Sequence, residues 1–409
     1  MFKPLIDKIQ ENYFISFIYL YIFVIPWHYF SWQQGLLSEI LVVWWFIIAK
    51  KQGYFNKLRL LFSNLPLMLL SLFVIYNYLS FFWSDNTKVY LESIHTFKYY
   101  LILIPVLYTS LKKENILISF LILLSSLFLF ALYSISIYLE LLTFNGYNPL
   151  IPIGYSSIPV VTPLIAIGTI ITLIFLLSQE LTNKMKYIFF IAFAIFLFSL
   201  FINQGRGAQL AFLISSLLVI SIFIIKHKNY SIIFAMFLVF IFSYSFLNLN
   251  HSKQLQRYQM GFNELSVAIE EENFKGSWGV RAYMWYAGAE SIQKHPIFGA
   301  GAGDNVDEFL EYMKTHPSYA TYLRTYHNHH LNFLTKYGIF GYILFWGSVL
   351  FLLISIRKHF FYMLLGVGYF SLIYIDGLAD IIISMNPHQS IFIIIFILLS
   401  VLLKENSTS

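Results

Sequence analysis

Long uncharged apolar runs recur along nearly the whole chain, and they constrain its fold more than any other feature. A run of about 18 residues or more is long enough to cross a bilayer core of about 30 Å as a helix. The chain is 58% hydrophobic and only 11% charged, whereas a soluble domain is about one-quarter charged. The runs are continuous rather than alternating, which indicates helices and not a β-barrel. We therefore expect an all-α integral membrane protein.

Hydropathy over successive windows predicts about twelve transmembrane helices in the 409 residues. The expected spans are residues 13–32, 36–49, 65–83, 97–111, 116–138, 158–177, 187–203, 208–226, 230–248, 330–356, 360–380 and 389–403. No cleavable signal peptide is expected, because the first apolar run carries no small-residue cleavage site.

The connections between these runs alternate in charge, which predicts the topology. One set of connections, together with both chain ends, is rich in basic residues: Lys3, Lys8, Lys50, Lys51, Lys57, Arg59, Lys112, Lys113, Lys184, Lys186, Lys226, Lys228, Arg357, Lys358 and Lys404. By the positive-inside rule this set is cytoplasmic. Both termini are then cytoplasmic, as an even number of spans requires.

One connection on the opposite side is long and charged. It runs from about Leu249 to Tyr326, which is too long for a simple connector. Helical patterns occur within it, and the one in DEFLEYMKTH has acids in its first turn and Lys314 and His316 in its last. We expect a small helical cap here. The chain then divides into residues 1–248 with nine spans, 249–328 as the cap loop, and 329–409 with three spans and a cytoplasmic tail.

Two arginines lie at the predicted outer membrane face. Arg206 stands between two glycines in FINQGRGAQLAF. It is either a snorkelling helix-end residue or a cation that faces a cavity and pairs with an anion, with the glycines letting the backbone approach a ligand. Arg281 opens a helical pattern in GSWGVRAYMWYAG. It is either an ordinary exposed charge or a phosphate partner at lipid headgroup height. The second interpretation follows from its aromatic neighbours, which suit a helix at the lipid interface: Trp278, Tyr283, Trp285 and Tyr286.

The stretch TYHNHHLNFLTKYGIFGY concentrates titratable chemistry at the start of an apolar run. If a helix begins near His327, Gly338 returns to nearly the same face about three turns later. Gly338 and Gly341 would then form a small-residue patch that lets a neighbouring helix pack closely. His327 is the candidate for proton transfer. We interpret His329 and His330 as interfacial aromatic residues with polar tips.

A metal site is the competing interpretation of this region. His327 and His330 are one turn apart, and His316 and Asp304 lie in the preceding loop. However, the chain has no cysteine and no HExxH motif, the usual ligand patterns for zinc. We predict no metal and no cofactor.

Other polar residues rank lower. Asp376 and Asp380 close an apolar run in IYIDGLADIII, and Glu39 lies within the second run. Acids in such runs are functional candidates, although a simple helix end explains the first two. The glycine-rich FGAGAGD at 298–304 is not a dinucleotide fingerprint, because no strand precedes it. We interpret it as a flexible loop that moves to admit substrate.

These residues together resemble a known family, the O-antigen ligase and polymerase superfamily of bacterial envelopes, and within it the WaaL-like ligases. The ligases carry a histidine followed by asparagine, serine or glutamine, then nine residues and a glycine, with a small residue three positions later. The matching residues here are His327, Asn328, Gly338 and Gly341. The family's outer-loop arginine matches Arg206, and its cap arginine ahead of HPxxGxGxG matches Arg281 ahead of HPIFGAGAG. The predicted topology is similar as well.

The resemblance implies a GT-C-like, metal-independent, inverting glycosyltransferase. Such an enzyme moves a glycan from undecaprenyl diphosphate to lipid A–core at the periplasmic face of the bacterial inner membrane. Arg206 and Arg281 would bind the diphosphate, because a guanidinium matches phosphate oxygens bidentately. His327 would activate or orient the acceptor hydroxyl, with Asn328 assisting. The partners implied are the lipid-linked donor, the lipid A–core acceptor and membrane lipids, with no nucleic acid.

Two alternatives stay open. A Wzy-type polymerase, in which the acceptor is another lipid-linked glycan, shares the topology and the arginines. A polytopic transporter or flippase would carry ionisable residues near the middle of several spans. Here the polar residues gather at the outer ends, with Glu39 as the exception.

Overall fold

The structure, a computed structural model, describes residues 13–27, 31–228, 253–316 and 325–404, and every regular element in these ranges is helical. The elements in chain order are α2 (Tyr13–Val24), η1 (Ile25–Trp27), α3 (Ser31–Ala49), α4 (Tyr54–Lys57), α5 (Arg59–Ser63), α6 (Leu65–Leu79), η2 (Ser80–Trp83), α7 (Thr87–Ser110), α8 (Lys113–Tyr138), α9 (Ile158–Leu177), α10 (Asn183–Ile202), α11 (Arg206–His227), α13 (Lys253–Glu270), α14 (Gly276–Lys294), α15 (Asn305–Thr315), α16 (His329–Ser355), α17 (Phe360–Asp376), η3 (Ile382–Ser384) and α18 (His388–Val401).

The described helices fit a protein that lies in a membrane. Six of them are long and apolar enough to cross one: Leu65–Trp83, Lys113–Tyr138, Ile158–Leu177, Asn183–Ile202, Arg206–His227 and His329–Ser355. Four shorter apolar helices accompany them: Tyr13–Trp27, Gln34–Ala49, Phe360–Asp376 and His388–Val401. The expected span 97–111 is the second half of α7, whose first half is polar. The expected span 230–248 lies outside the described residues.

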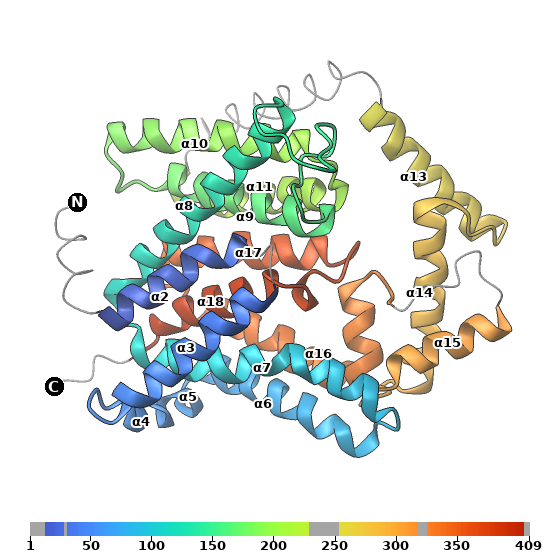
Figure 1. Cartoon of the computed structure of the whole chain (residues 1–409), viewed down its shortest axis with the longest axis horizontal. Helices are drawn as coiled ribbons and strands as arrows, with labels where there is room; N and C mark the ends of the chain where they lie inside the picture. The colour runs from blue at the N-terminus through green and yellow to red at the C-terminus, as the bar shows by residue number, and fades with distance from the viewer. Residues whose placement is uncertain (1–12, 28–30, 229–252, 317–324, 405–409) are drawn as a thin grey trace.

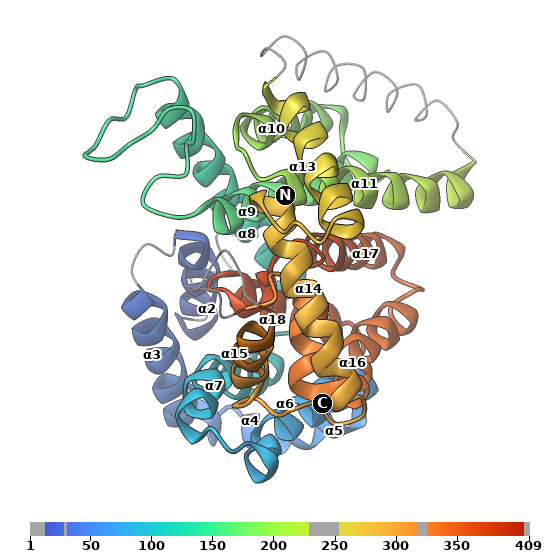
Figure 2. The same ribbon diagram turned by 90° about the vertical axis from the view of Figure 1, so that its right-hand side faces the viewer.

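Helix α18 forms the centre of the bundle. Each of its residues from His388 to Val401 is buried, as expected for a helix that is apolar all round. Figures 1 and 2 show α17 and α18 between two groups of helices, with α9, α10 and α11 on one side and α6, α7 and α16 on the other. Helix α17 packs along α11 and α9, which places its C-terminal end beside the start of α11.

Three helices, α13, α14 and α15, form a cap (residues 253–316) at one end of the bundle (Figures 1 and 2). The cap has a small core of its own, made of Tyr283, Met284, Ala287 and Phe309 together with Tyr326. Tyr283 was expected at a lipid interface, but it is buried in this core and donates a hydrogen bond to the His316 carbonyl. Burial raises the pKa of the Tyr283 hydroxyl to about 12.

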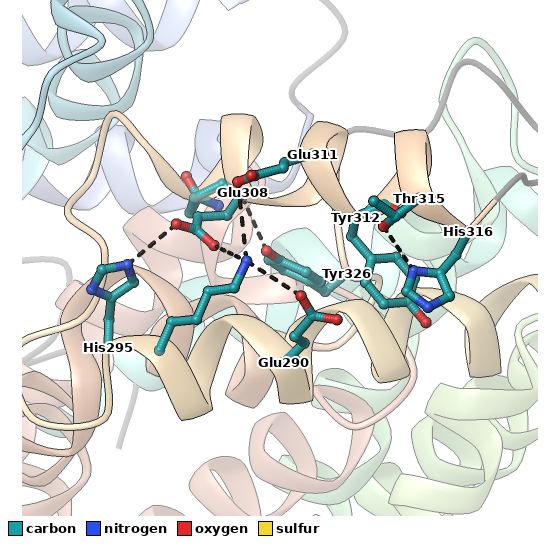
Figure 3. Close-up of polar contacts among 10 residues, drawn as sticks. Glu290, His295, Glu308, Glu311, Tyr312, Thr315, His316 and Tyr326 are labelled. Atoms are coloured by element: carbon teal, nitrogen blue, oxygen red, sulfur yellow. Dashed lines mark hydrogen bonds and ion pairs between the residues drawn. The ribbon is translucent and has the colours of Figure 1, made fainter.

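Charged side chains link the end of α14 to α15 (Figure 3). Lys294 Nζ lies 3.2 Å from Glu290, 3.4 Å from Glu308 and 4.0 Å from Glu311. His295 Nε2 lies 3.2 Å from the same Glu308. Because the Lys294 side chain is 40% exposed, each ion pair contributes at most about 1 kcal/mol. The apolar core therefore holds the cap together more than this network does.

Helix α16 is broken at Gly338. Its φ of 60° and ψ of −170° are not helical, and a positive φ favours glycine. A Cβ at this position would overlap the Ile297 carbonyl and lie 2.6 Å from Gly299 N. The expected continuous helix from His327 to Gly338 is therefore wrong, because the helix starts at His329 and its regular geometry stops at Gly338. Gly341, one turn further, lies against Tyr76 of α6.

The glycine-rich segment that follows α14 pairs with this break. Four backbone bonds join them: Ala300 N to Thr335 O at 2.8 Å, Gly301 N to Lys336 O at 3.1 Å, Ile339 N to Pro296 O at 2.9 Å and Phe340 N to Ile297 O at 3.1 Å. They satisfy the carbonyls and N–H groups that the break releases. Our interpretation of residues 298–304 as a flexible loop is therefore wrong, since backbone pairing holds the segment on α16.

Candidate functional site

The turn at residues 376–380, at the end of α17, is contacted by three segments that carry sequence-predicted residues. It lies beside the first turn of α11, where a Cβ on Gly207 would stand 2.7 Å from Asp376 Oδ1 and 3.3 Å from the Ala379 Cβ. Residues of α14 and of the start of α16 also contact this turn. Three segments distant in the sequence thus converge on five residues.

His327 faces the end of this turn. Its Nδ1 lies 3.4 Å from Asp380 Oδ1, with the two side chains 39% and 15% exposed. The same Asp380 oxygen accepts a hydrogen bond from Ile381 N at 2.9 Å, which fixes the carboxylate. A carboxylate beside Nδ1 favours a proton on that nitrogen and leaves Nε2, on the other edge of the ring, as the acceptor.

The backbone of His327 is strained. Its φ is 41°, in the left-handed region that costs an ordinary residue about 1–2 kcal/mol. Both neighbours are anchored. Tyr326 is buried and donates a hydrogen bond to Asn305 O of the cap at 3.0 Å. Asn328 is hydrogen-bonded to Leu378 O of the bundle. The strain is therefore imposed by contacts on either side of the histidine.

Asn328 is the N-cap of α16. Its Oδ1 accepts hydrogen bonds from His330 N at 2.9 Å and Leu331 N at 3.1 Å, the usual role of asparagine at a helix start. Its Nδ2 donates to Leu378 O at 3.1 Å. Both ends of the amide are thus engaged in fixing α16 to the turn. The assignment of Asn328 to substrate binding stays a prediction.

Arg281, in the second turn of α14, reaches the same turn. Its Nε donates to Ala379 O at 3.3 Å, and its Nη1 donates to the Ser277 hydroxyl at 2.8 Å. The guanidinium also lies over the Trp278 ring, 5.6 Å from its centre. These contacts hold one side of the guanidinium and point to Nη2 as the nitrogen that an anion would meet.

Arg206 is the first residue of α11, where the helix dipole favours an anion. Its Nη1 lies 3.5 Å from the point that a Cβ of Gly261 in α13 would occupy. The flanking glycines were expected to admit a ligand. Instead Gly205 admits Thr162 of α9, whose side chain a Cβ would overlap, and Gly207 admits Asp376. They bring protein side chains close to α11.

His329 and His330 are buried inside the protein, not at a lipid interface, so our interpretation of them is wrong. His330 Nδ1 lies 2.9 Å from the Tyr342 hydroxyl, and Nε2 donates to Tyr374 O at 2.9 Å. The His329 ring packs on Phe333 at 4.1 Å. Its backbone N donates to Gly377 O at 2.6 Å. Both residues therefore bind α16 to α17.

The residues considered for a metal site serve separate contacts. Asp304 accepts hydrogen bonds from Asp85 N and Asn86 N at 2.9 and 2.8 Å, and His316 stacks on Tyr312. Within the described ranges, no three His, Cys, Asp or Glu side chains are grouped to hold a metal ion. Glu39 is exposed on α3.

Two features of the site were not evident from sequence. Asp380 was ranked below the histidine that it faces, although an acid at the end of an apolar run was the available signal. Trp278 was assigned to a lipid interface, yet it contacts Arg281. Nothing in the spacing of GSWGVRAYMWYAG distinguishes a tryptophan beside an arginine from one facing lipid.

Comparison with known protein families finds a match over part of the chain. A family model described as O-antigen ligase matches residues 188–346, a stretch that contains Arg206, Arg281 and His327. The search of curated proteins finds no match. The family match, together with the helical membrane architecture, supports membership of the O-antigen ligase superfamily.

Proposed function

We propose that the protein is an O-antigen ligase, a metal-independent inverting glycosyltransferase that moves a glycan from undecaprenyl diphosphate to lipid A–core. The observation that carries the proposal is the meeting of His327, Arg281 and the start of α11 at one turn, with Asp380 facing the histidine. Transfer from a lipid diphosphate needs a proton acceptor and cations, and the three segments that meet here carry them.

In the proposed step, an acceptor sugar hydroxyl attacks the anomeric carbon of the donor from the face opposite the diphosphate. The new glycosidic C–O bond forms as the bond from the anomeric carbon to the diphosphate oxygen breaks. The bonding electrons leave on undecaprenyl diphosphate, and the hydroxyl proton passes to His327 Nε2. Asp380 holds the ring and stabilises the imidazolium that results.

The two arginines stabilise the negative charge of the leaving group. Negative charge builds on the departing diphosphate, and guanidinium groups fixed in advance stabilise it without rearrangement. Arg281 is fixed by Ser277 and Ala379. Arg206 stands at a helix N-terminus, whose dipole has the same sign. Loss of one such donor typically costs about 2.7–4 kcal/mol.

The proposed setting is a GT-C-like bundle of about twelve spans in the bacterial inner membrane, with the cap in the periplasm and both termini in the cytoplasm. Two observations support it. The basic connections and the charged cap alternate along the chain. The first residues of α2 and the last of α18 lie at the end of the bundle away from the cap (Figure 1).

The test is transfer by the purified chain in lipid, supplied with lipid-linked donor and lipid A–core and followed by product mass. His327→Ala, Arg206→Ala and Arg281→Ala should each lower transfer by about 10²-fold or more. Excess chelator should leave the rate unchanged. Near-normal transfer by His327→Ala would show that His327 is not the proton acceptor. Strict dependence on a divalent cation would contradict the arginine mechanism.

A Wzy-type polymerase is the second candidate, because the matching family covers both activities. Gene deletion separates the two. Loss of a ligase leaves full-length lipid-linked polymer unattached, whereas loss of a polymerase leaves lipid A–core with a single repeat unit. A transporter or flippase would move the lipid-linked glycan in vesicles without any covalent product.

A further inference from the structure

The indole of Trp278 contacts Arg281 and shares a neighbour with Arg206. Arg281 Cζ is 5.6 Å from the Trp278 ring centre. Trp278 Cδ1 lies 2.7 Å, and Arg206 Nη1 3.5 Å, from the point where a Cβ of Gly261 would stand. The arginines come from α11 and α14, so this tryptophan lies where a bundle helix and a cap helix each bring a cation.

Gly261 makes this arrangement possible. A Cβ there would lie 2.7 Å from Trp278 Cδ1 and 2.8 Å from Nε1, closer than a real contact allows. With hydrogen in that place, the indole packs directly on α13, close to the point that Arg206 Nη1 also approaches. A methyl group at this position would displace the ring.

The start of α14 is also fixed by α13. Trp278 N donates to Glu264 Oε2 at 2.9 Å, so the carboxylate caps the helix that carries both Trp278 and Arg281. Gly276 allows this approach, because a Cβ there would overlap the Glu264 carboxyl group. The backbone that carries the indole is therefore held by Glu264 of α13, in a contact that does not involve the arginines.

We infer that Trp278 is a positioning residue that holds Arg281 beside Arg206, so that both face a single diphosphate. The inference rests on the proposed function and adds a residue to its donor site. Two like charges repel, and the indole offers the Arg281 guanidinium an attractive face that offsets this. Two cations held near each other suit two linked phosphates, whereas a monophosphate engages fewer of their donors. The site should therefore prefer a lipid diphosphate to a lipid monophosphate.

The test is equilibrium binding to the full-length chain in nanodiscs, with undecaprenyl diphosphate and undecaprenyl phosphate as probes. Neither probe carries a glycan, so no transfer is needed. Trp278→Ala should weaken diphosphate binding about 3- to 30-fold, the range of cation–π interactions, and monophosphate binding much less. Trp278→Phe should keep most of the affinity, because a phenyl ring still presents a face. Gly261→Ala should act like Trp278→Ala.

Trp285 provides the matched control, since it stands two turns along the same helix with its ring 6.1 Å from Trp278. Trp285→Ala should leave diphosphate binding within about twofold. Equal losses for Trp278→Phe and Trp278→Ala, or for the two phosphates, would overturn the positioning role. A wild-type chain with no preference for the diphosphate would overturn both this inference and the donor class in the proposed function. A preference that Trp278→Ala leaves intact would overturn this inference alone.

Discussion

At the scale of single residues, His327 combines strain with a charged neighbour. A positive φ at a non-glycine residue persists only where the surroundings impose it. Here Tyr326 is anchored in the cap and Asn328 in the bundle. The histidine is consequently held in one orientation before any substrate arrives, which is the preorganisation that efficient proton transfer requires.

Asp380→Asn tests that orientation. The amide keeps the size of the side chain but removes the charge that faces His327 Nδ1, so the favoured tautomer and the stabilised imidazolium are both lost. We expect kcat to fall about 10- to 100-fold, part of the typical general-base contribution, with donor KM nearly unchanged. Steady-state transfer assays measure both constants.

Glu311→Gln is the control for Asp380→Asn, because it removes an exposed cap carboxylate and should leave kcat unaltered. A loss confined to donor KM in Asp380→Asn would instead assign Asp380 to substrate binding.

The candidate residues were chosen from the sequence alone, whereas their pairing could not be predicted from it. Motif spacing singled out His327, Arg206 and Arg281. The contact of His327 with Asp380 depends on how α16 and α17 pack, and no local pattern encodes that. The N-cap role of Asn328 could have been read from its place before an apolar helical run, had the helix start been placed at His329.

At the scale of elements, the break in α16 joins two patterns that the sequence presents separately. The glycine at 338 and the run HPIFGAGAG each suggested close packing or flexibility. In the fold the two segments lie side by side, and backbone hydrogen bonds in both directions join them. A glycine in an apolar run is compatible with a continuous helix, so only the paired segment reveals the break.

Gly338→Ala should unfold this region. The substitution combines a positive φ with overlap against the Ile297 carbonyl, and we expect a loss of at least about 2 kcal/mol. Thermal unfolding of the purified chain in detergent measures it.

The comparison for Gly338→Ala is Gly347→Ala in the same helix, where the nearest atom to a new Cβ is Ile343 Cγ2 at 3.9 Å. That variant should be neutral or more stable by up to about 1 kcal/mol. Equal unfolding temperatures for the two variants would contradict the paired break.

At the scale of the whole molecule, the fold class could be predicted from composition. Long uncharged apolar runs satisfy their backbone hydrogen bonds in a membrane by forming helices. The number of spans did not follow so directly. The first half of α7 is polar, so its apolar half does not stand alone as a span. Helix α18 is only as long as a short span, yet it is buried on every side. Hydropathy cannot separate a core helix from a lipid-facing one.

Single-cysteine labelling tests the proposed orientation, and the chain suits it because it contains no cysteine. Glu311→Cys in the cap and Lys51→Cys after α3 are both at exposed positions. A membrane-impermeant maleimide applied to cells with a permeabilised outer membrane should label the first and not the second. Labelling of Lys51→Cys should require cell lysis, and the reverse pattern would invert the topology.

The pairing at the α16 break has a consequence for how a bulky glycan enters. Helix α14 packs on α16, and the segment after it is bonded to α16 across the break. The break therefore ties the segment that follows α14 to a helix of the bundle, and Arg281 is itself bonded to Ala379 in the turn after α17. Asn328 fixes the start of α16, next to His327, to the same turn. The cap is thus joined to the bundle on two sides of the site, and a glycan has to enter from a side that neither joint closes.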